Sequence, residues 1–177
     1  QAAKGGISQL ASSVRVNNEI IKRRPDSAAL LYDVVHRSRH GEEKDGRLNT
    51  YGIPVFGVRD GKFTSHYSRT YVEAAQELET VPRMSDAQWE ALDLLAKVAA
   101  EVCMEMRFEP GDMQLVNNHV IYHARTAYED GADKRCLKRI WLSMPNSRAL
   151  PEEHAAAPNV LVVSLPNLQL TQKRKFV

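Results

Sequence analysis

The stretch that most constrains the fold runs from Glu109 to Pro145, because it holds two strand-like segments joined by a polar loop. The first segment, Met113 to Ala124, carries His123 at its end and is expected to bend in its middle. The second segment, Arg135 to Ser143, alternates in side-chain character with the period of two that is typical of a strand. We expect the two segments to pair antiparallel.

Both arginines of the second segment lie on one face of the expected strand. The side chains predicted to share that face are Arg135, Leu137, Arg139 and Trp141. Two arginines on a mostly apolar face are costly to bury unless anions meet them. A guanidinium group suits this role, because its rigid fork pairs bidentately with a carboxylate and stays charged at any working pH. The sequence therefore predicts a carboxylate-binding pocket beside the strand that carries His123.

The clearest helical pattern spans Ser85 to Met106. Ser85 and Gln88 form a capping box ahead of apolar residues that recur at helical spacing. A weaker pattern around Asn17 to Ile21 is ended by Pro25, and we expect a second helix directly after that proline. The sequence thus predicts two linked helices near the N-terminus and one long amphipathic helix.

A further hairpin is predicted for Ile53 to Ser68, because β-prone segments flank Asp60 and Gly61, a dipeptide suited to a tight turn. Arg37 to Asn49 is charged and shows no sustained period, so we expect an exposed loop there. The isolated histidines expected to be solvated are His36, His66 and His154.

Composition narrows the class of protein. With 177 residues and 43% apolar content, the chain can bury one sizeable core, so we expect residues 1–177 to form a single domain. The 24 basic and 22 acidic residues are scattered, which predicts no nucleic-acid partner, and no apolar run is long enough to predict a membrane partner. The two cysteines, Cys103 and Cys136, form no CxxC pair, so we expect a reducing, cytoplasmic location.

Several segments together resemble the taurine dioxygenase-like family of iron(II)/2-oxoglutarate oxygenases, in its branch with small-molecule substrates. The most specific is GDMQLVNNHVIYHARTAYED followed by RCLKRIWL, which is similar to the family's distal-histidine and arginine motif. QAAKGGISQLASS resembles its strand and turn with the GGx[ST] pattern, and PVFGVRDGKFTSHYSRTYVEAAQ resembles its hairpin and short helix. The resemblance covers most of the chain. It implies a mainly β fold with flanking helices, a double-stranded β-helix or jelly roll, of which this chain would supply only part.

The resemblance also implies roles for four residues. His123 falls on the distal histidine of a facial triad that holds Fe(II) and leaves sites for 2-oxoglutarate and dioxygen. Arg135 falls on the arginine that binds the distal carboxylate of 2-oxoglutarate, and Ser8 on the hydroxyl residue that assists it. Arg139 falls on a following arginine near the substrate or co-substrate.

The implied activity is hydroxylation of a small carboxylate-, sulfonate- or amino-acid-type substrate, with release of succinate and CO2. The implied partners are that substrate and dioxygen, and a homo-oligomer is compatible with the sequence.

The chain departs from the family pattern at both ends. The family's HxD motif supplies the other two metal ligands and lies upstream of GGx[ST], whereas this sequence begins only a few residues before that pattern. His40-Gly41-Glu42 has the right spacing, but it follows the helix pair instead of preceding Ser8, and we interpret it as an accidental match. We expect the missing ligands upstream of Gln1. The tail, residues 155–177, matches nothing in the family.

Each implied role has a simpler structural alternative. Without the resemblance, His123 would be a hydrogen-bonded structural histidine, as we expect for His119. Arg135 could form an ion pair with Asp130 or Glu129 across the turn, and the Ser8 hydroxyl could cap a turn. A rival reading from a different class is a non-catalytic jelly-roll module that keeps the arginine pair to bind an anionic small molecule.

Overall fold

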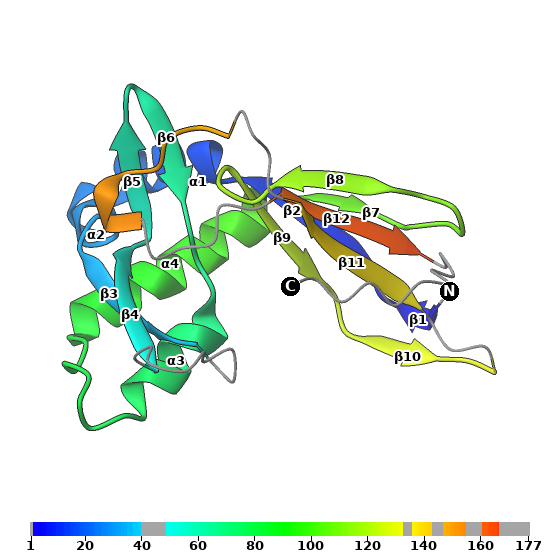
Figure 1. The fold of residues 1–177 in the computed structure, drawn as a ribbon, viewed down its shortest axis with the longest axis horizontal. Helices are drawn as coiled ribbons and strands as arrows, with labels where there is room; N and C mark the ends of the chain where they lie inside the picture. Colours follow the sequence, from blue (N-terminus) through cyan, green and yellow to red (C-terminus); the bar gives the residue numbers. More distant parts are fainter. Residues whose placement is uncertain (1, 40–48, 133–135, 143–146, 155–160, 167–177) are drawn as a thin grey trace, which may run out of the picture.

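The chain forms a lobe of paired strands beside a lobe in which helices and two hairpins enclose the core, as Figure 1 shows. The computed structural model describes residues 2–39, 49–132, 136–142, 147–154 and 161–166. Strands outnumber helices, and the arrangement is the expected partial double-stranded β-helix with flanking helices. Across the described ranges, no helix is both long enough and apolar enough to cross a bilayer.

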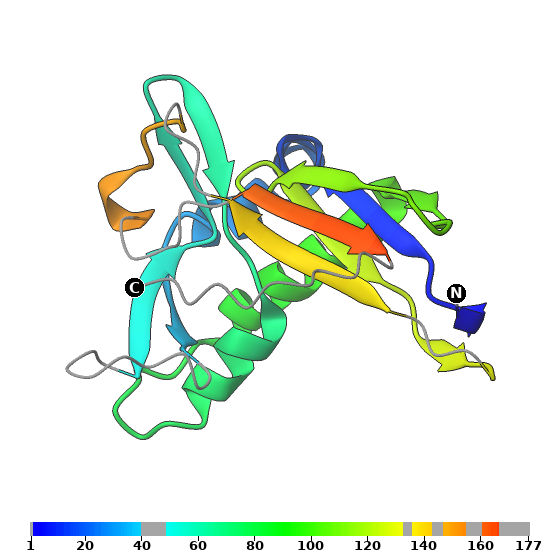
Figure 2. The same cartoon turned by 45° about the vertical axis from the view of Figure 1, so that its right-hand side comes forward.

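The strand lobe contains two three-stranded antiparallel sheets, which lie face to face in Figure 2. The first sheet has the order β7 (Met104–Met106), β2 (Ser8–Ser12) and β9 (Ile121–Arg125). The second has the order β11 (Leu137–Leu142), β12 (Leu161–Pro166) and β8 (Gln114–Asn117). At the far end of this lobe, β1 (Ala2–Gly5) pairs antiparallel with β10 (Tyr128–Asp130).

The expected direct pairing of residues 113–124 with residues 135–143 is wrong. The first segment is divided by a turn, closed by a 3.1 Å hydrogen bond from the Val120 amide to the Asn117 carbonyl, into β8 and β9, which belong to different sheets. The apolar stretch at 161–166 of the tail forms β12, which lies between β8 and β11 and pairs with both. This position satisfies backbone groups that β8 and β11 would otherwise leave unpaired.

The second lobe surrounds the main hydrophobic core. Its helices are α1 (Ser13–Arg23), α2 (Pro25–Leu30), α3 (Arg69–Gln76) and α4 (Asp86–Val102), with the short helix η1 (Glu152–His154). Its hairpins are β3 (Val34–Ser38) with β4 (Thr50–Pro54), and β5 (Phe56–Arg59) with β6 (Lys62–Ser65). The fully enclosed core side chains include Val16, Ile20, Phe56, Leu92 and Leu95.

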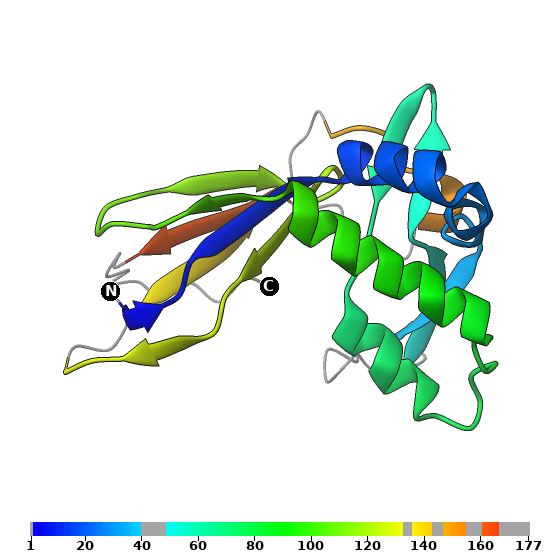
Figure 3. The ribbon, with the colours of Figure 1, turned by 180° about the vertical axis from the view of Figure 1, so that it is seen from behind.

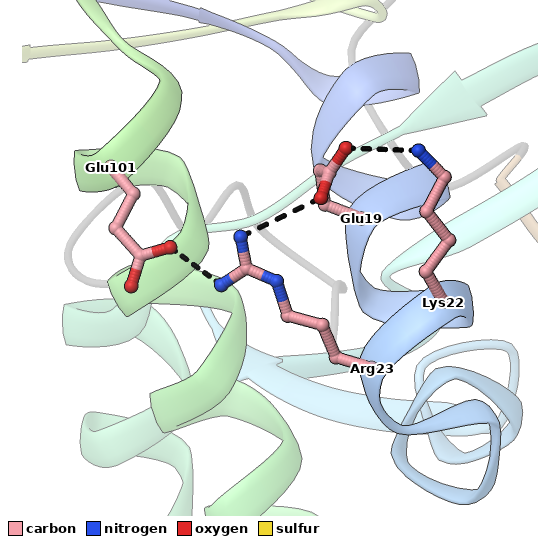
Figure 4. A network of polar contacts seen from close by, with 4 residues as sticks. All are labelled: Glu19, Lys22, Arg23 and Glu101. Atoms are coloured by element: carbon pink, nitrogen blue, oxygen red, sulfur yellow. Dashed lines mark hydrogen bonds and ion pairs between the residues drawn. The ribbon is translucent and has the colours of Figure 1, made fainter.

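Helix α4 lies along the back of this lobe beside α1, as Figure 3 shows. A network of ion pairs joins the two helices in Figure 4, where Arg23 bridges Glu19 of its own helix and Glu101 of α4. The Arg23 Nη1 to Glu101 Oε2 distance is 2.5 Å. Because these groups are exposed to solvent, the pairs add little stability, and burial of the apolar faces holds the helices together.

The local predictions are confirmed at most helix and hairpin positions. The capping box at Ser85 and Gln88 is present, but α4 ends at Val102, because residues 104–106 leave the helix to pair with β2 as β7. Pro25 separates α1 from α2 as expected. The hairpin turn contains Asp60 at φ 51° and Gly61 at φ 70°, the left-handed conformation that such a turn requires.

Replacing Ser85 by alanine is expected to lower the free energy of unfolding by about 1 kcal/mol, because the Ser85 hydroxyl accepts a hydrogen bond from the Gln88 amide. Ser68 occupies the same capping position on α3 but makes no side-chain cap hydrogen bond. Ser68→Ala is therefore the matched control and should be nearly neutral. Urea unfolding of both variants measures the difference, and equal losses would contradict the assigned role of the cap.

Candidate functional site

His123 and Ser8 lie on one face of the β7-β2-β9 sheet. In the antiparallel register of β2 and β9, Ser8 is opposite Arg125 and Leu10 is opposite His123. Opposite residues share a face of the sheet, as do residues two apart in one strand. Tyr122 precedes His123 and therefore lies on the other face, where it packs against the core.

The His123 side chain is partly buried, and its surroundings suit a metal ligand. Its Nδ1 atom is enclosed and has no hydrogen-bond partner. The pKa of His123 is lowered, first by burial and then by the positive charge of Arg139. The imidazole is therefore neutral at pH 7, which is the form that binds a metal. A buried, unpartnered imidazole nitrogen is also costly for a purely structural histidine, so this geometry fits a metal ligand.

The two sheets bring Ser8 and Arg139 into one cross-section of the strand lobe. In the first sheet, Ser8 is in register with Met106 of β7. In the second sheet, Gln114 of β8 and Arg139 of β11 are both in register with Ser164 of β12. Gln114 Nε2 lies 3.4 Å from the Met106 sulfur, which aligns the two rows across the gap between the sheets. His123 is one step along the same inner surface. This surface can therefore present a hydroxyl, an imidazole and a guanidinium together.

The turn before Ser8 depends on the two glycines of the GGx[ST] pattern. Gly5 and Gly6 both have a φ of 70°, a conformation that residues with a Cβ rarely adopt. The Gly6 amide donates to the Ala127 carbonyl at 3.1 Å, and the Ile7 amide donates to the Thr126 hydroxyl at 3.0 Å. These bonds fix the start of β2 against the end of β9, and the Ser8 side chain is buried there.

Two of the candidates fall outside the part of the chain that the structure describes. Arg135 is one, and His40-Gly41-Glu42 is the other, so both keep the status of predictions. Among the described residues, no group of three or more histidine, cysteine or acidic side chains is arranged to hold a metal ion. A metal site that included His123 would need further ligands from outside the described residues.

Of the histidines expected to be solvated, His154 is buried and His66 is half-buried. His154 is 1% exposed, and burial lowers the pKa of His66 to about 3. Arg37, expected in an exposed loop, is 0% exposed in β3. Val35 and Arg37 alternate with more exposed neighbours in the manner of a strand. An alternating pattern of this kind predicts a strand, but the charged residues around it led to the prediction of an exposed loop.

Comparison with known proteins identifies the family. The pattern described as "Taurine catabolism dioxygenase TauD, TfdA family" matches residues 1–141, most of the chain. The chain belongs to the TauD/TfdA family. Members of this family depend on Fe(II) and 2-oxoglutarate, and their fold is a jelly roll, in agreement with the two sheets described above.

Two curated relatives of this TauD/TfdA chain are informative. FR-33289 synthase from Streptomyces rubellomurinus is 31% identical over 158 residues, covering 85% of this chain and 47% of the relative. The taurine hydroxylase-like protein SAT17 from Stachybotrys chartarum is 28% identical over 130 residues, covering 70% of this chain and 32% of the relative. The chain therefore spans less than half the length of either protein.

Proposed function

We propose that this TauD/TfdA chain is part of an Fe(II)- and 2-oxoglutarate-dependent dioxygenase. The proposed reaction is hydroxylation of a small carboxylate-, sulfonate- or amino-acid-type substrate, with release of succinate and CO2. The observation that supports it best is the neutral His123, whose unpartnered Nδ1 lies in the strand lobe on the same face as Ser8. Residues 1–177 would form one domain, and the two free cysteines support a reducing, cytoplasmic setting.

Each candidate residue has a distinct task in this proposal. His123 would hold Fe(II) together with ligands from outside the described residues. Ser8 and Arg135 would bind the distal carboxylate of 2-oxoglutarate, because a hydroxyl and a guanidinium both donate to carboxylate oxygens. Arg139 would orient an acidic group of the substrate. Bound iron and co-substrate supply the oxidising chemistry with dioxygen, and the chain's own share is to position the reactants and exclude water.

Anaerobic addition of Fe(II) and 2-oxoglutarate to the full-length protein tests the metal assignment. The wild type is expected to develop the visible charge-transfer band of the iron chelate, and His123→Ala is expected to lose it. His36→Ala, in β3 of the other lobe, is the matched control and should keep the band. A band that persists unchanged in His123→Ala would refute the assignment of His123.

The division of labour between the arginines is tested by 2-oxoglutarate binding to the same protein. Arg135→Ala is expected to weaken binding by roughly tenfold to a hundredfold, the loss typical of a charge-assisted hydrogen-bonded pair. Arg139→Ala should have a much smaller effect on 2-oxoglutarate and a larger one on the substrate. Equal effects on 2-oxoglutarate would contradict the proposed roles.

A second candidate function is a non-catalytic jelly-roll module that binds an anionic small molecule. It is compatible with one observation: among the described residues, no group of three or more histidine, cysteine or acidic side chains is arranged to hold a metal ion. Binding measurements distinguish this function from the first. A non-catalytic module would bind 2-oxoglutarate or the substrate through Arg135 or Arg139, and neither the addition of Fe(II) nor His123→Ala would change that affinity.

A further inference from the structure

Arg125 lies on the inner surface of the strand lobe, and it has no task in the function proposed above. It is the last residue of β9, it is exposed, and it is the register partner of Ser8. Because residues two apart in a strand share a face, Arg125 also lies on the face of His123. Two residues advance a strand by roughly 7 Å, so the two backbone positions are about that far apart.

Arg125 and Arg139 lie at the same level of the two sheets. A row across the first sheet consists of Met106, Ser8 and Arg125. The row at this level of the second sheet consists of Gln114, Ser164 and Arg139. One end of each row meets the other, because Gln114 Nε2 is 3.4 Å from the Met106 sulfur. The opposite ends, Arg125 and Arg139, therefore face each other at the edge where β9 lies next to β11 in Figures 1, 2 and 3.

The ring of Tyr128 holds the guanidinium of Arg125 in place. The Arg125 Cζ atom lies over this ring, 4.1 Å from its centroid. Such a cation–π contact uses the flat face of the guanidinium. The five N–H groups lie in the plane of the guanidinium, so stacking directs them sideways and away from the ring. Tyr128 belongs to β10, which is fixed by its pairing with β1. The protein thus orients this exposed arginine for hydrogen bonds to an anion.

Two guanidinium groups at one edge favour a ligand with two negative charges. Like charges held near each other repel, and an anion that binds both of them removes the repulsion. Arg125 and Arg139 are both exposed, so a molecule can reach this edge from solvent. Ser8, in contrast, is buried on the central strand β2, where it suits the co-substrate carboxylate. Arg139 also lies close enough to His123 for its charge to lower the pKa of that histidine.

We propose that Arg125 and Arg139 together bind the acidic end of the substrate, and that this end carries two negative charges. Two neighbouring carboxylates or a phosphoryl group meet this requirement, whereas a lone sulfonate does not. Tyr128 is a positioning residue, because it holds the plane of the Arg125 guanidinium. The inference rests on the proposed function in one respect, the role of Arg139 as a substrate-binding residue. Loss of the charge-transfer band in His123→Ala is a separate result, so the metal assignment and the arginine pair can fail independently.

Calorimetric titration of the full-length protein with methyl phosphate and with methyl sulfate tests the charge requirement. The two anions have nearly the same shape, but at about pH 8 methyl phosphate carries two charges and methyl sulfate carries one. Saturating 2-oxoglutarate in every titration keeps both probes out of the co-substrate site. The wild type is expected to bind methyl phosphate about tenfold more tightly than methyl sulfate. Equal affinities for the two anions, or no binding of methyl phosphate, would overturn the proposal.

Three glutamine variants assign the effect to the two arginines. Arg125→Gln and Arg139→Gln should each weaken methyl phosphate binding roughly tenfold and remove most of the preference over methyl sulfate. Arg83→Gln, a change to an exposed arginine between α3 and α4, is the control for net charge and should keep the wild-type preference. A preference that is unchanged in Arg125→Gln or in Arg139→Gln would show that the two arginines do not act as a pair. Loss of 2-oxoglutarate binding in Arg125→Gln would also overturn the proposal, because Arg125 would then belong to the co-substrate site.

Two variants of Tyr128 test its positioning role. Tyr128→Phe keeps an aromatic face for Arg125 and should bind methyl phosphate as the wild type does. Tyr128→Leu loses the cation–π contact, and it should weaken methyl phosphate binding roughly threefold and lower the preference over methyl sulfate. Equal affinities in the two variants would contradict a role for the aromatic ring.

Discussion

Lowering the pH from 7 to 5 is expected to destabilise the protein by about 2 kcal/mol through His66 alone. In the unfolded chain a histidine takes up a proton near its ordinary pKa of 6.5, whereas in the folded protein burial and the Arg37 charge lower the pKa of His66 to about 3. Between these values the unfolded state binds more protons, so acid favours unfolding. The contribution is fully present above about pH 6.5 and is lost as the pH falls toward 3.

Urea unfolding at pH 7, 6 and 5 in chloride salts measures this dependence. His66→Gln keeps an acceptor for Arg37 but cannot titrate, so its stability should fall by about 2 kcal/mol less than that of the wild type over this range. The remaining dependence comes partly from His123 and His154, whose pKa values are also lowered, mainly by burial. Parallel curves for His66→Gln and the wild type would show that His66 is not held neutral.

The elements that could be predicted from the sequence are those fixed by neighbouring residues. The capping box at Ser85 and Gln88 works within one helical turn, so its residues alone locate the start of α4. The hairpin turn at Asp60 and Gly61 likewise depends on two adjacent residues in the left-handed conformation. Such signals do not depend on the rest of the fold, and they were confirmed.

Strand pairing could not be predicted in the same way, because it joins distant segments. The end of the long helical pattern became β7, because Met104–Met106 is the partner of β2, roughly a hundred residues earlier in the chain. The position of β12 between β8 and β11 similarly depends on backbone groups that no local pattern reveals. At β7, pairing with β2 therefore outweighs the local helical pattern.

The candidate site shows the same division. His123 was identified from its place at a strand end and from a motif, and the structure adds the register that puts it on one face with Ser8. The neutral state of its ring depends on burial and on Arg139, which comes from a different sheet. Arg37 was missed because a charged residue in a polar stretch suggests solvent, and only the packing of β3 against α3 and β4 shows that it is enclosed.

Replacing Gly5 by alanine is expected to cost about 3 kcal/mol of folding free energy. Gly5 has a φ of 70°, and an added Cβ would lie 2.1 Å from the Ala127 carbonyl oxygen. That oxygen is fixed, because it accepts the hydrogen bond from the Gly6 amide. The clash can therefore be relieved only by moving β1 away from β10, which would also release the start of β2 and the buried Ser8.

Gly111→Ala separates the effect of backbone conformation from that of the clash. Gly111 has a φ of 98°, but an added Cβ would meet no heavy atom within 4 Å. Gly111→Ala should therefore lower the free energy of unfolding only by the cost of the strained backbone, roughly 1–2 kcal/mol. Urea unfolding gives the global difference, and amide hydrogen exchange at Gly6 and Ile7 reports local opening. If Ser8 assists the co-substrate carboxylate, 2-oxoglutarate affinity should fall in Gly5→Ala and stay unchanged in Gly111→Ala. Equal stability losses in the two variants would mean that the Ala127 carbonyl does not hold this turn, and the role of the GGx[ST] pattern would then rest on backbone conformation alone.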